Sequence, residues 1–161
     1  LGAKYIILGH SENRANGDTD ITINKKINSA LKQKLTVIFC IGETLAQKKR
    51  KETNRIIRKQ ITQGLKGFKK NSRIIIAYEP VWSIGTGIIP KNHELEKNIK
   101  FINLTISKNT KLRKIKILYG GSVNPKNIQS LNAIHMLDGY LIGVVSQNAK
   151  KLIDIVRKSY N

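Results

Sequence analysis

Five short apolar runs constrain the fold of this 161-residue chain more than any other feature of its sequence. Each run ends in glycine or a polar cluster. Continuous apolar runs of this length are typical of strands that are buried on both faces, as in a parallel sheet. The predicted strands cover residues 5–8, 37–41, 74–77, 115–119 and 140–142.

The stretches between the predicted strands carry apolar residues at helical spacing. These stripes consist of Ile23, Ile27, Ala30 and Leu31, of Ile56, Ile57, Ile61 and Leu65, and of Leu95, Ile99, Ile102 and Ile106. Asn124 with Pro125 predicts the start of a further helix, and Ser146 predicts the start of the last one. Strand followed by helix, repeated five times, predicts a parallel α/β fold with residues 1–161 in a single domain. A doubly wound sheet and a barrel both fit this order.

The charge balance raises nucleic acid as a partner, because 30 Lys and Arg face only 10 Asp and Glu, for a net charge of +20. We expect no nucleic-acid partner, since the basic residues are scattered and a genome rich in A and T also favours Lys, Ile and Asn. No run approaches the roughly 18 apolar residues of a membrane helix, and no signal peptide precedes the first strand. We therefore expect a soluble, cytoplasmic protein without a membrane partner. Cys40 lies inside an apolar run and is expected to be a buried, inert thiol.

The stretch at residues 77–87 places a carboxylate at the end of a predicted strand, beside a loop that could close. Pro80 would end the strand directly after Glu79. The loop is apolar at Val81, Trp82 and Ile84, which would find shelter only if it packs down, and its glycines allow a hinge. A buried glutamate followed by an ordinary turn explains the same residues.

In a parallel barrel, the carboxyl ends of all strands surround one mouth, where active sites are built. His10 and Glu79 could then face one substrate from two sides, and backbone N–H groups near Ser122 and Gly143 could hold a phosphate. A carboxylate base, an imidazole and a lid permit proton abstraction next to a carbonyl. No cluster has metal-ligand spacing, so we expect neither a metal nor a cofactor.

Five motifs along the chain resemble, in order and in spacing, those of the triosephosphate isomerase family. They are Leu8-Gly9-His10-Ser11-Glu12, Cys40-Ile41-Gly42-Glu43-Thr44, the stretch at residues 77–87, Tyr119-Gly120-Gly121-Ser122-Val123 and Asp138-Gly139-Tyr140-Leu141-Ile142-Gly143. The resemblance covers essentially the whole chain. It implies a (β/α)8 TIM barrel, represented here by the five consecutive units of strands 4 to 8.

The resemblance also implies an activity: the interconversion of dihydroxyacetone phosphate and glyceraldehyde 3-phosphate through an enediolate, in glycolysis and gluconeogenesis. Glu79 would be the base and His10 the electrophile, as in triosephosphate isomerases generally. The resemblance also implies which residues form the lid, which positions bind the phosphate and which side chains support the site. The lid would be Pro80, Val81, Trp82, Ser83, Ile84, Gly85 and Thr86; the phosphate would be bound at Gly85, Ser122, Gly143 and Val144; and Ser11, Glu12 and Glu43 would support the site, Glu43 through Trp82.

The chain departs from the family pattern in two main respects. A complete barrel has about 250 residues, and the family's first strand carries an Asn and a Lys that bind substrate and have no counterpart here. Val144 stands where the family usually has a second glycine. Because the sequence begins at Leu1 without an initiator methionine, we expect that it starts inside a longer reading frame.

These departures leave three hypotheses for the chain. In the first, it is the carboxyl-terminal part of a homodimeric isomerase and is impaired on its own. In the second, it is an inactive or split-gene remnant of that enzyme. In the third, it is a basic nucleic-acid-binding protein built on a reused barrel. We also expect the strands near Lys4 and Tyr140 to form two open edges that invite aggregation.

Overall fold

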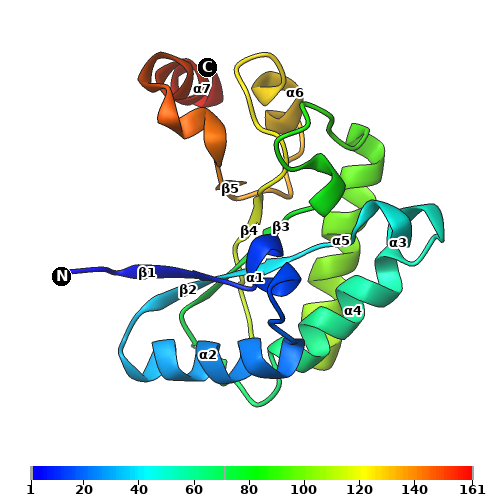
Figure 1. Cartoon of the computed structure of the whole chain (residues 1–161), viewed down its shortest axis with the longest axis vertical. Coiled ribbons are helices and arrows are strands. Elements are labelled where there is room, and N and C mark those ends of the chain that lie inside the picture. The colour runs from blue at the N-terminus through cyan, green and yellow to red at the C-terminus, as the bar shows by residue number, and fades with distance from the viewer. Residues whose placement is uncertain (1, 71, 161) are drawn as a thin grey trace.

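The structure is a computed structural model that describes residues 2–70 and 72–160 (Figure 1). Its strands form one sheet in which all neighbours are parallel, in the order β1-β2-β3-β4-β5. The strands are β1 (Tyr5–Leu8), β2 (Thr36–Ile41), β3 (Ile74–Tyr78), β4 (Ile117–Tyr119) and β5 (Gly139–Tyr140). A doubly wound sheet reverses its strand order at a switch point. This sheet does not, so it is part of a barrel, as predicted.

Helices connect each strand to the next. They are α1 (Ser11–Ala15), α2 (Asp20–Lys32), α3 (Leu45–Lys49), α4 (Thr53–Gly64), α5 (Asn92–Asn109), α6 (Ile128–Asn132) and α7 (Ala149–Tyr160), with short 3-10 turns η1 (Val81–Ser83) and η2 (Val144–Gln147). Figure 1 shows α2, α4 and α5 side by side along the sheet, while α6 and α7 lie together near β5. None of the helices described is long and apolar enough to cross a bilayer.

The predicted apolar stripes form the core between helices and sheet. Ile23 and Ile27 of α2, Ile61 of α4 and Ile99 of α5 have no exposed surface. They pack with strand residues such as Phe39 into one hydrophobic cluster. Burial of each such side chain contributes about 1.5–3 kcal/mol, so the helical stripes hold the sheet in place.

The predicted ends of several elements were wrong. β4 begins two residues after Ile115, and β5 ends at Tyr140 rather than at residue 142. Asn124 does not begin a helix: its side chain accepts the N–H groups of Lys126 (2.9 Å) and Asn127 (3.3 Å) in a turn, and α6 starts only at Ile128.

The last helix also starts later than predicted. Ser146 lies in η2, where its hydroxyl donates to the carbonyl of Gly143 (2.8 Å). Asn148 takes the place of the predicted cap, because its side chain accepts the N–H of Lys151 (3.0 Å) at the start of α7. Polar side chains that cap helices also close turns, so residue type alone did not locate these starts.

The sheet register aligns the strand ends that carry the candidate site. Ile41 pairs with Tyr78, Tyr78 with Tyr119, and Tyr119 with Tyr140. The residues that directly follow these positions, among them Glu79, therefore emerge along one rim of the sheet.

Candidate active site

Glu79 leaves the end of β3 with its backbone still held by the sheet, because its N–H donates to the carbonyl of Ile41 (2.8 Å). The residue is only 4% exposed. Its Oε2 atom has no hydrogen-bond partner among the residues that the structure describes. Burial raises the pKa of the Glu79 carboxyl, and the neighbouring Cys40 thiol and His10 imidazole offset part of that rise. A raised pKa strengthens a carboxylate as a general base.

Glycines on the two neighbouring strands make room for Glu79. A Cβ atom at Gly42, after β2, would collide with the Glu79 carbonyl, and one at Gly120, after β4, would lie 2.6 Å from Glu79 Cγ. Both contacts are shorter than real Cβ contacts allow. Gly120 thus leaves room for the Glu79 side chain and Gly42 for its backbone, a function of these glycines that the sequence did not reveal.

His10 follows β1 and stands just before α1. Its Nε2 atom lies 3.9 Å from Oε1 of Glu79, and its Nδ1 atom lies 3.8 Å from Oε2 of Glu12. The two predicted catalytic side chains, which come from different strand ends, therefore face each other. Ser11 is the first residue of α1, and the side chain of Glu12 is 84% exposed.

Arg14 anchors the loop that carries His10. Its Nε–H donates to the carbonyl of Gly9 (2.8 Å), and its Nη1–H donates to Oδ1 of Asp20 (2.7 Å). A third bond joins Nη2 to the carbonyl of Cys40 (3.2 Å). The sequence analysis missed this residue, because a single arginine in a short helix has no motif that separates it from the many surface cations.

The lid begins as the turn η1, and Trp82 holds its first half. The indole Nε1–H donates to Oε1 of Glu43 (2.9 Å), as the resemblance implied. Oε2 of Glu43 accepts from the Tyr78 hydroxyl (3.1 Å), which in turn accepts from the Asn98 amide (2.9 Å). Glu43 is 1% exposed. Burial raises its pKa, and the bonds from Trp82 and Tyr78 oppose the rise.

Ser83 within the lid and Gly87 directly after it are bonded to residues at the end of β4. Gly87 N–H donates to the Ser122 hydroxyl (3.1 Å). Ser83 Oγ lies 2.9 Å from the Tyr119 hydroxyl and accepts the Ser122 N–H at 3.3 Å. Burial raises the pKa of Tyr119 to about 12, so this phenol stays protonated at neutral pH. The lid is therefore pinned at both ends to the rim of the sheet.

A cavity of about 310 Å³ brings the predicted residues together. It is lined by all six residues predicted for catalysis and phosphate binding, which are His10, Glu79, Gly85, Ser122, Gly143 and Val144. Ile84 of the lid also lines it. Among the described residues, the N–H groups of Gly85 and Gly143 meet no hydrogen-bond acceptor, whereas the Ser122 N–H is already taken by Ser83.

One further side chain near the site, Cys40, has no visible chemical use. Cys40 is buried, and burial together with the nearby Glu79 raises the pKa of its thiol far above the ordinary value, so it is no nucleophile. Within residues 2–70 and 72–160, no group of three or more His, Cys, Asp or Glu could hold a metal ion. The arrangement is one of a buried carboxylate, an imidazole and backbone N–H donors beside the predicted lid.

Comparison with known proteins decides the family. The family model described as triosephosphate isomerase matches residues 1–159. The chain belongs to the triosephosphate isomerase family. Among curated relatives with that name, the protein of Geotalea uraniireducens is 42% identical over 164 residues, covering 98% of this chain and 65% of the relative. The protein of Thermodesulfovibrio yellowstonii is 40% identical over 159 residues, covering 97% and 65%.

The chain therefore spans slightly less than two thirds of the length of these triosephosphate isomerases. The resemblance that the five motifs indicated is confirmed, and so is the α/β fold with its parallel sheet.

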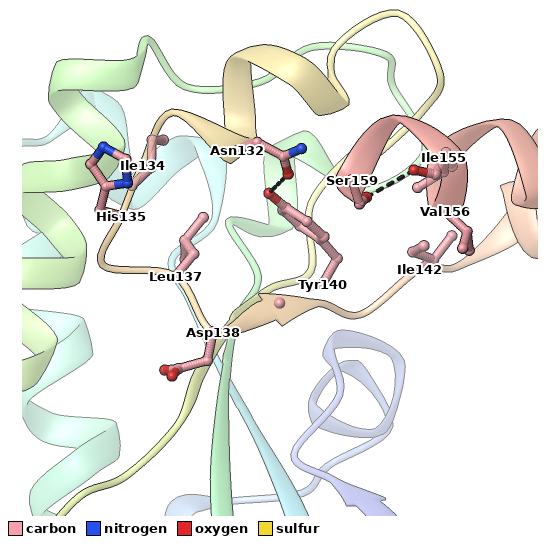
Figure 2. A pocket seen from close by; sticks show the side chains of 11 residues that line it. Asn132, Ile134, His135, Leu137, Asp138, Tyr140, Ile142, Ile155, Val156 and Ser159 are labelled. Atoms are coloured by element: carbon pink, nitrogen blue, oxygen red, sulfur yellow. Dashed lines mark hydrogen bonds between the residues drawn. The ribbon is translucent and has the colours of Figure 1, made fainter. Parts of the chain in front are cut away.

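A larger cavity of about 510 Å³ lies between α6, α7 and β5 (Figure 2) and shares only Ile142 with the lining of the first. Its polar groups do not converge. Figure 2 shows Tyr140 bonded to Asn132, with its hydroxyl donating to the amide oxygen (2.7 Å), while His135 lies well apart from both. Asp138 accepts the backbone N–H of Ile117 (2.8 Å) and so serves the sheet. Size alone does not identify the active site here.

Proposed function

We propose that these residues form the proton-transfer side of a triosephosphate isomerase site. The reaction interconverts dihydroxyacetone phosphate and glyceraldehyde 3-phosphate through an enediolate. One observation carries the proposal: a buried carboxylate shares a cavity beside the lid with a histidine and two backbone N–H donors, and one oxygen of the carboxylate and both N–H groups have no hydrogen-bond partner among the described residues. That combination suits proton abstraction next to a carbonyl on a small anionic substrate.

In the proposed mechanism, Glu79 removes a proton from the carbon next to the carbonyl and returns it to the former carbonyl carbon. The imidazole of His10 stabilises the enediolate oxygen between the two steps. The Glu79 side chain lines the cavity, and its Oε2 atom has no hydrogen-bond partner among the described residues, so the carboxylate has an oxygen left to accept a proton. Burial raises the Glu79 pKa, so the carboxylate gains proton affinity without any change in residue type.

The substrate phosphate would bind at the opposite side of the cavity, to the N–H groups of Gly85, Gly143 and Val144. For the phosphate to bind at Ser122, the Ser122 N–H would have to leave the Ser83 hydroxyl and donate to the phosphate instead. Its bond to Ser83 is long, at 3.3 Å, and therefore weak. Val144 is 71% exposed, so its branched side chain is not packed into the protein. The net charge of +20 favours the approach of an anion.

We further propose that the 161-residue polypeptide alone, a single domain of partial barrel, is impaired. The family's substrate-binding Asn and Lys have no counterpart within it. Loss of one preorganised electrostatic group costs about 100- to 1000-fold in kcat. The intact protein would act in glycolysis and gluconeogenesis in the cytoplasm, as a homodimer without a cofactor.

A coupled assay on the purified chain and on Glu79→Gln tests both parts. We expect turnover at least about 100-fold below that of a full-length relative, and a further loss to background in Glu79→Gln. Turnover close to the relative's would disprove the impairment. Residual turnover that is equal in both proteins would disprove the assignment of Glu79 as the base.

A further inference from the structure

The face of the Trp82 ring carries a contact that the proposed mechanism does not use. Lys48 Nζ lies 3.8 Å from the centroid of the ring. A cation over an aromatic face is attracted by the ring quadrupole, most strongly when it is partly desolvated. The side chain of Lys48 is 28% exposed, so water screens this contact only in part.

Two neighbouring elements hold the ammonium group in place. Lys48 lies on α3, whose start is fixed by the Thr44 hydroxyl accepting the N–H of Gln47 and the Gln47 amide oxygen accepting the N–H of Thr44. Oε1 of Glu94, on α5, accepts from Lys48 Nζ at 2.6 Å. The Glu94 carboxylate thus helps to hold the cation over the ring.

The Trp82 side chain is consequently held by contacts to both its edge and its face. Glu43 binds the edge of the indole through Nε1, and Lys48 covers its face. Both contacts exist only while the first half of the lid lies against α3. Opening of the lid would have to break both Trp82 contacts at once. The bond from Gly87 to Ser122 is at the opposite end of the loop, beyond Thr86.

We propose that Lys48 is a positioning residue for the lid: with Glu94 it clamps Trp82 and stabilises the closed lid over the cavity. Among the described residues, no hydrogen bond or ion pair joins Lys48 to Glu79 or His10. Lys48 reaches the site through Trp82 and through its charge near Glu43, whose pKa it lowers. The catalytic consequence rests on the proposed function, but the clamp itself does not.

Trp82 is the single tryptophan of the chain, so its fluorescence reports the clamp without any turnover. The experiment measures quenching of Trp82 emission by acrylamide in the parent chain, Lys48→Ala, Lys48→Arg and Glu94→Gln. We expect the quenching constant to rise at least about twofold in Lys48→Ala, because the ring loses its cover. Glu94→Gln should raise it by a smaller factor, and Lys48→Arg should restore the parent value.

Lys49→Ala is the matched control, since Lys49 is an exposed lysine at the next position of α3. It should leave quenching unchanged.

Far-ultraviolet circular dichroism separates loss of the clamp from unfolding. The conservative Glu94→Gln variant still tests the proposal if Lys48→Ala does not fold. Quenching in Lys48→Ala or Glu94→Gln equal to that of the parent, or failure of Lys48→Arg to restore it, would overturn the proposal. Residual isomerase turnover that is equal in the parent chain and in Glu79→Gln, together with the expected quenching, would contradict the proposed function and leave the clamp standing.

Discussion

At the scale of single residues, Glu79 combines two properties that oppose each other in an ordinary protein core. It is buried, and one of its carboxylate oxygens has no partner among the described residues. A buried charge without full hydrogen bonding lowers stability, and such groups persist where function requires them. Burial raises the Glu79 pKa, so the folded state holds this proton more tightly than the unfolded state does.

The first prediction concerns pH. Because the pKa of Glu79 is raised on folding, its contribution to stability is present at low pH and is lost as the pH rises through the folded-state value. Glu79→Gln should therefore raise the free energy of unfolding at neutral pH by about 1–3 kcal/mol. The gain should shrink below about pH 4, where both side chains are neutral. Urea unfolding of the parent and of Glu79→Gln at neutral pH and below about pH 4 provides the measurement. An equal change in the free energy of unfolding at both pH values would contradict the prediction.

The second prediction concerns the room that Gly120 leaves for the Glu79 side chain. A Cβ atom at position 120 would lie 2.6 Å from Glu79 Cγ and 2.8 Å from its Oε1. Gly120→Ala should lower the free energy of unfolding by about 1–3 kcal/mol through overpacking. Gly120→Ala in the Glu79→Ala background is the control, because the three atoms nearest to a Cβ at position 120 all belong to the Glu79 side chain. Chemical denaturation of both variants, each against its own background, provides the measurement, and equal losses would show that Gly120 does not make room for Glu79.

At the scale of elements, α4 supports the end of β2 through one side chain. The buried Gln60 accepts the N–H of Gly42 (2.8 Å) and donates to the Gly42 carbonyl (3.1 Å). Gly42 in turn packs against the backbone of Glu79. A helix that covers the sheet thereby also holds the strand end beside the proposed base.

The third prediction follows from this pair of bonds. Gln60→Ala leaves both backbone groups of Gly42 without their partner, so the free energy of unfolding should fall by about 2–4 kcal/mol. Gln63→Ala, at an exposed position of the same helix, should change it by less than about 0.5 kcal/mol. Thermal or urea unfolding of the two variants distinguishes them; a loss in Gln60→Ala no larger than in the control would refute the supporting role.

The elements also show what the sequence could and could not predict. The strands and the stripes on α2, α4 and α5 were predictable because apolar periodicity reflects burial directly. The motifs located all six cavity residues that carry the proposal. Arg14 and Gln60 were missed, because a polar side chain that bonds a distant backbone group leaves no periodic pattern. Asn124 and Ser146 misled for a related reason, since turn and cap use the same residue types.

At the scale of the whole molecule, the sheet has two edges within the described chain, at β1 and β5. β1 presents exposed apolar side chains, with Tyr5 at 60% and Ile7 at 44% exposure. Figure 1 shows this strand reaching away from the rest of the protein. Unpaired apolar edges favour association between chains, while the net charge of +20 opposes it.

The fourth prediction is that the apolar edge at β1 outweighs the repulsion from the net charge, so that the chains associate with one another. Ile7→Lys should reduce self-association, because a charge on an edge strand blocks pairing. Ile21→Lys, at a 63% exposed position on α2, adds the same charge away from the edge and should have little effect. Sedimentation velocity at matched concentrations compares the three proteins. An equal reduction in both variants would assign the effect to charge alone.

The most direct test of the central claim is an activity assay of a chimaera. In it, the part of a full-length relative that precedes the matched segment is fused to the amino terminus of this chain. Fused to that segment, this chain should gain at least about 100-fold in isomerase turnover over the 161 residues alone. Glu79→Gln in the chimaera should remove at least about 100-fold of it, the range expected for a general base. A folded chimaera no faster than the chain alone, or one that keeps its activity without Glu79, would contradict the account.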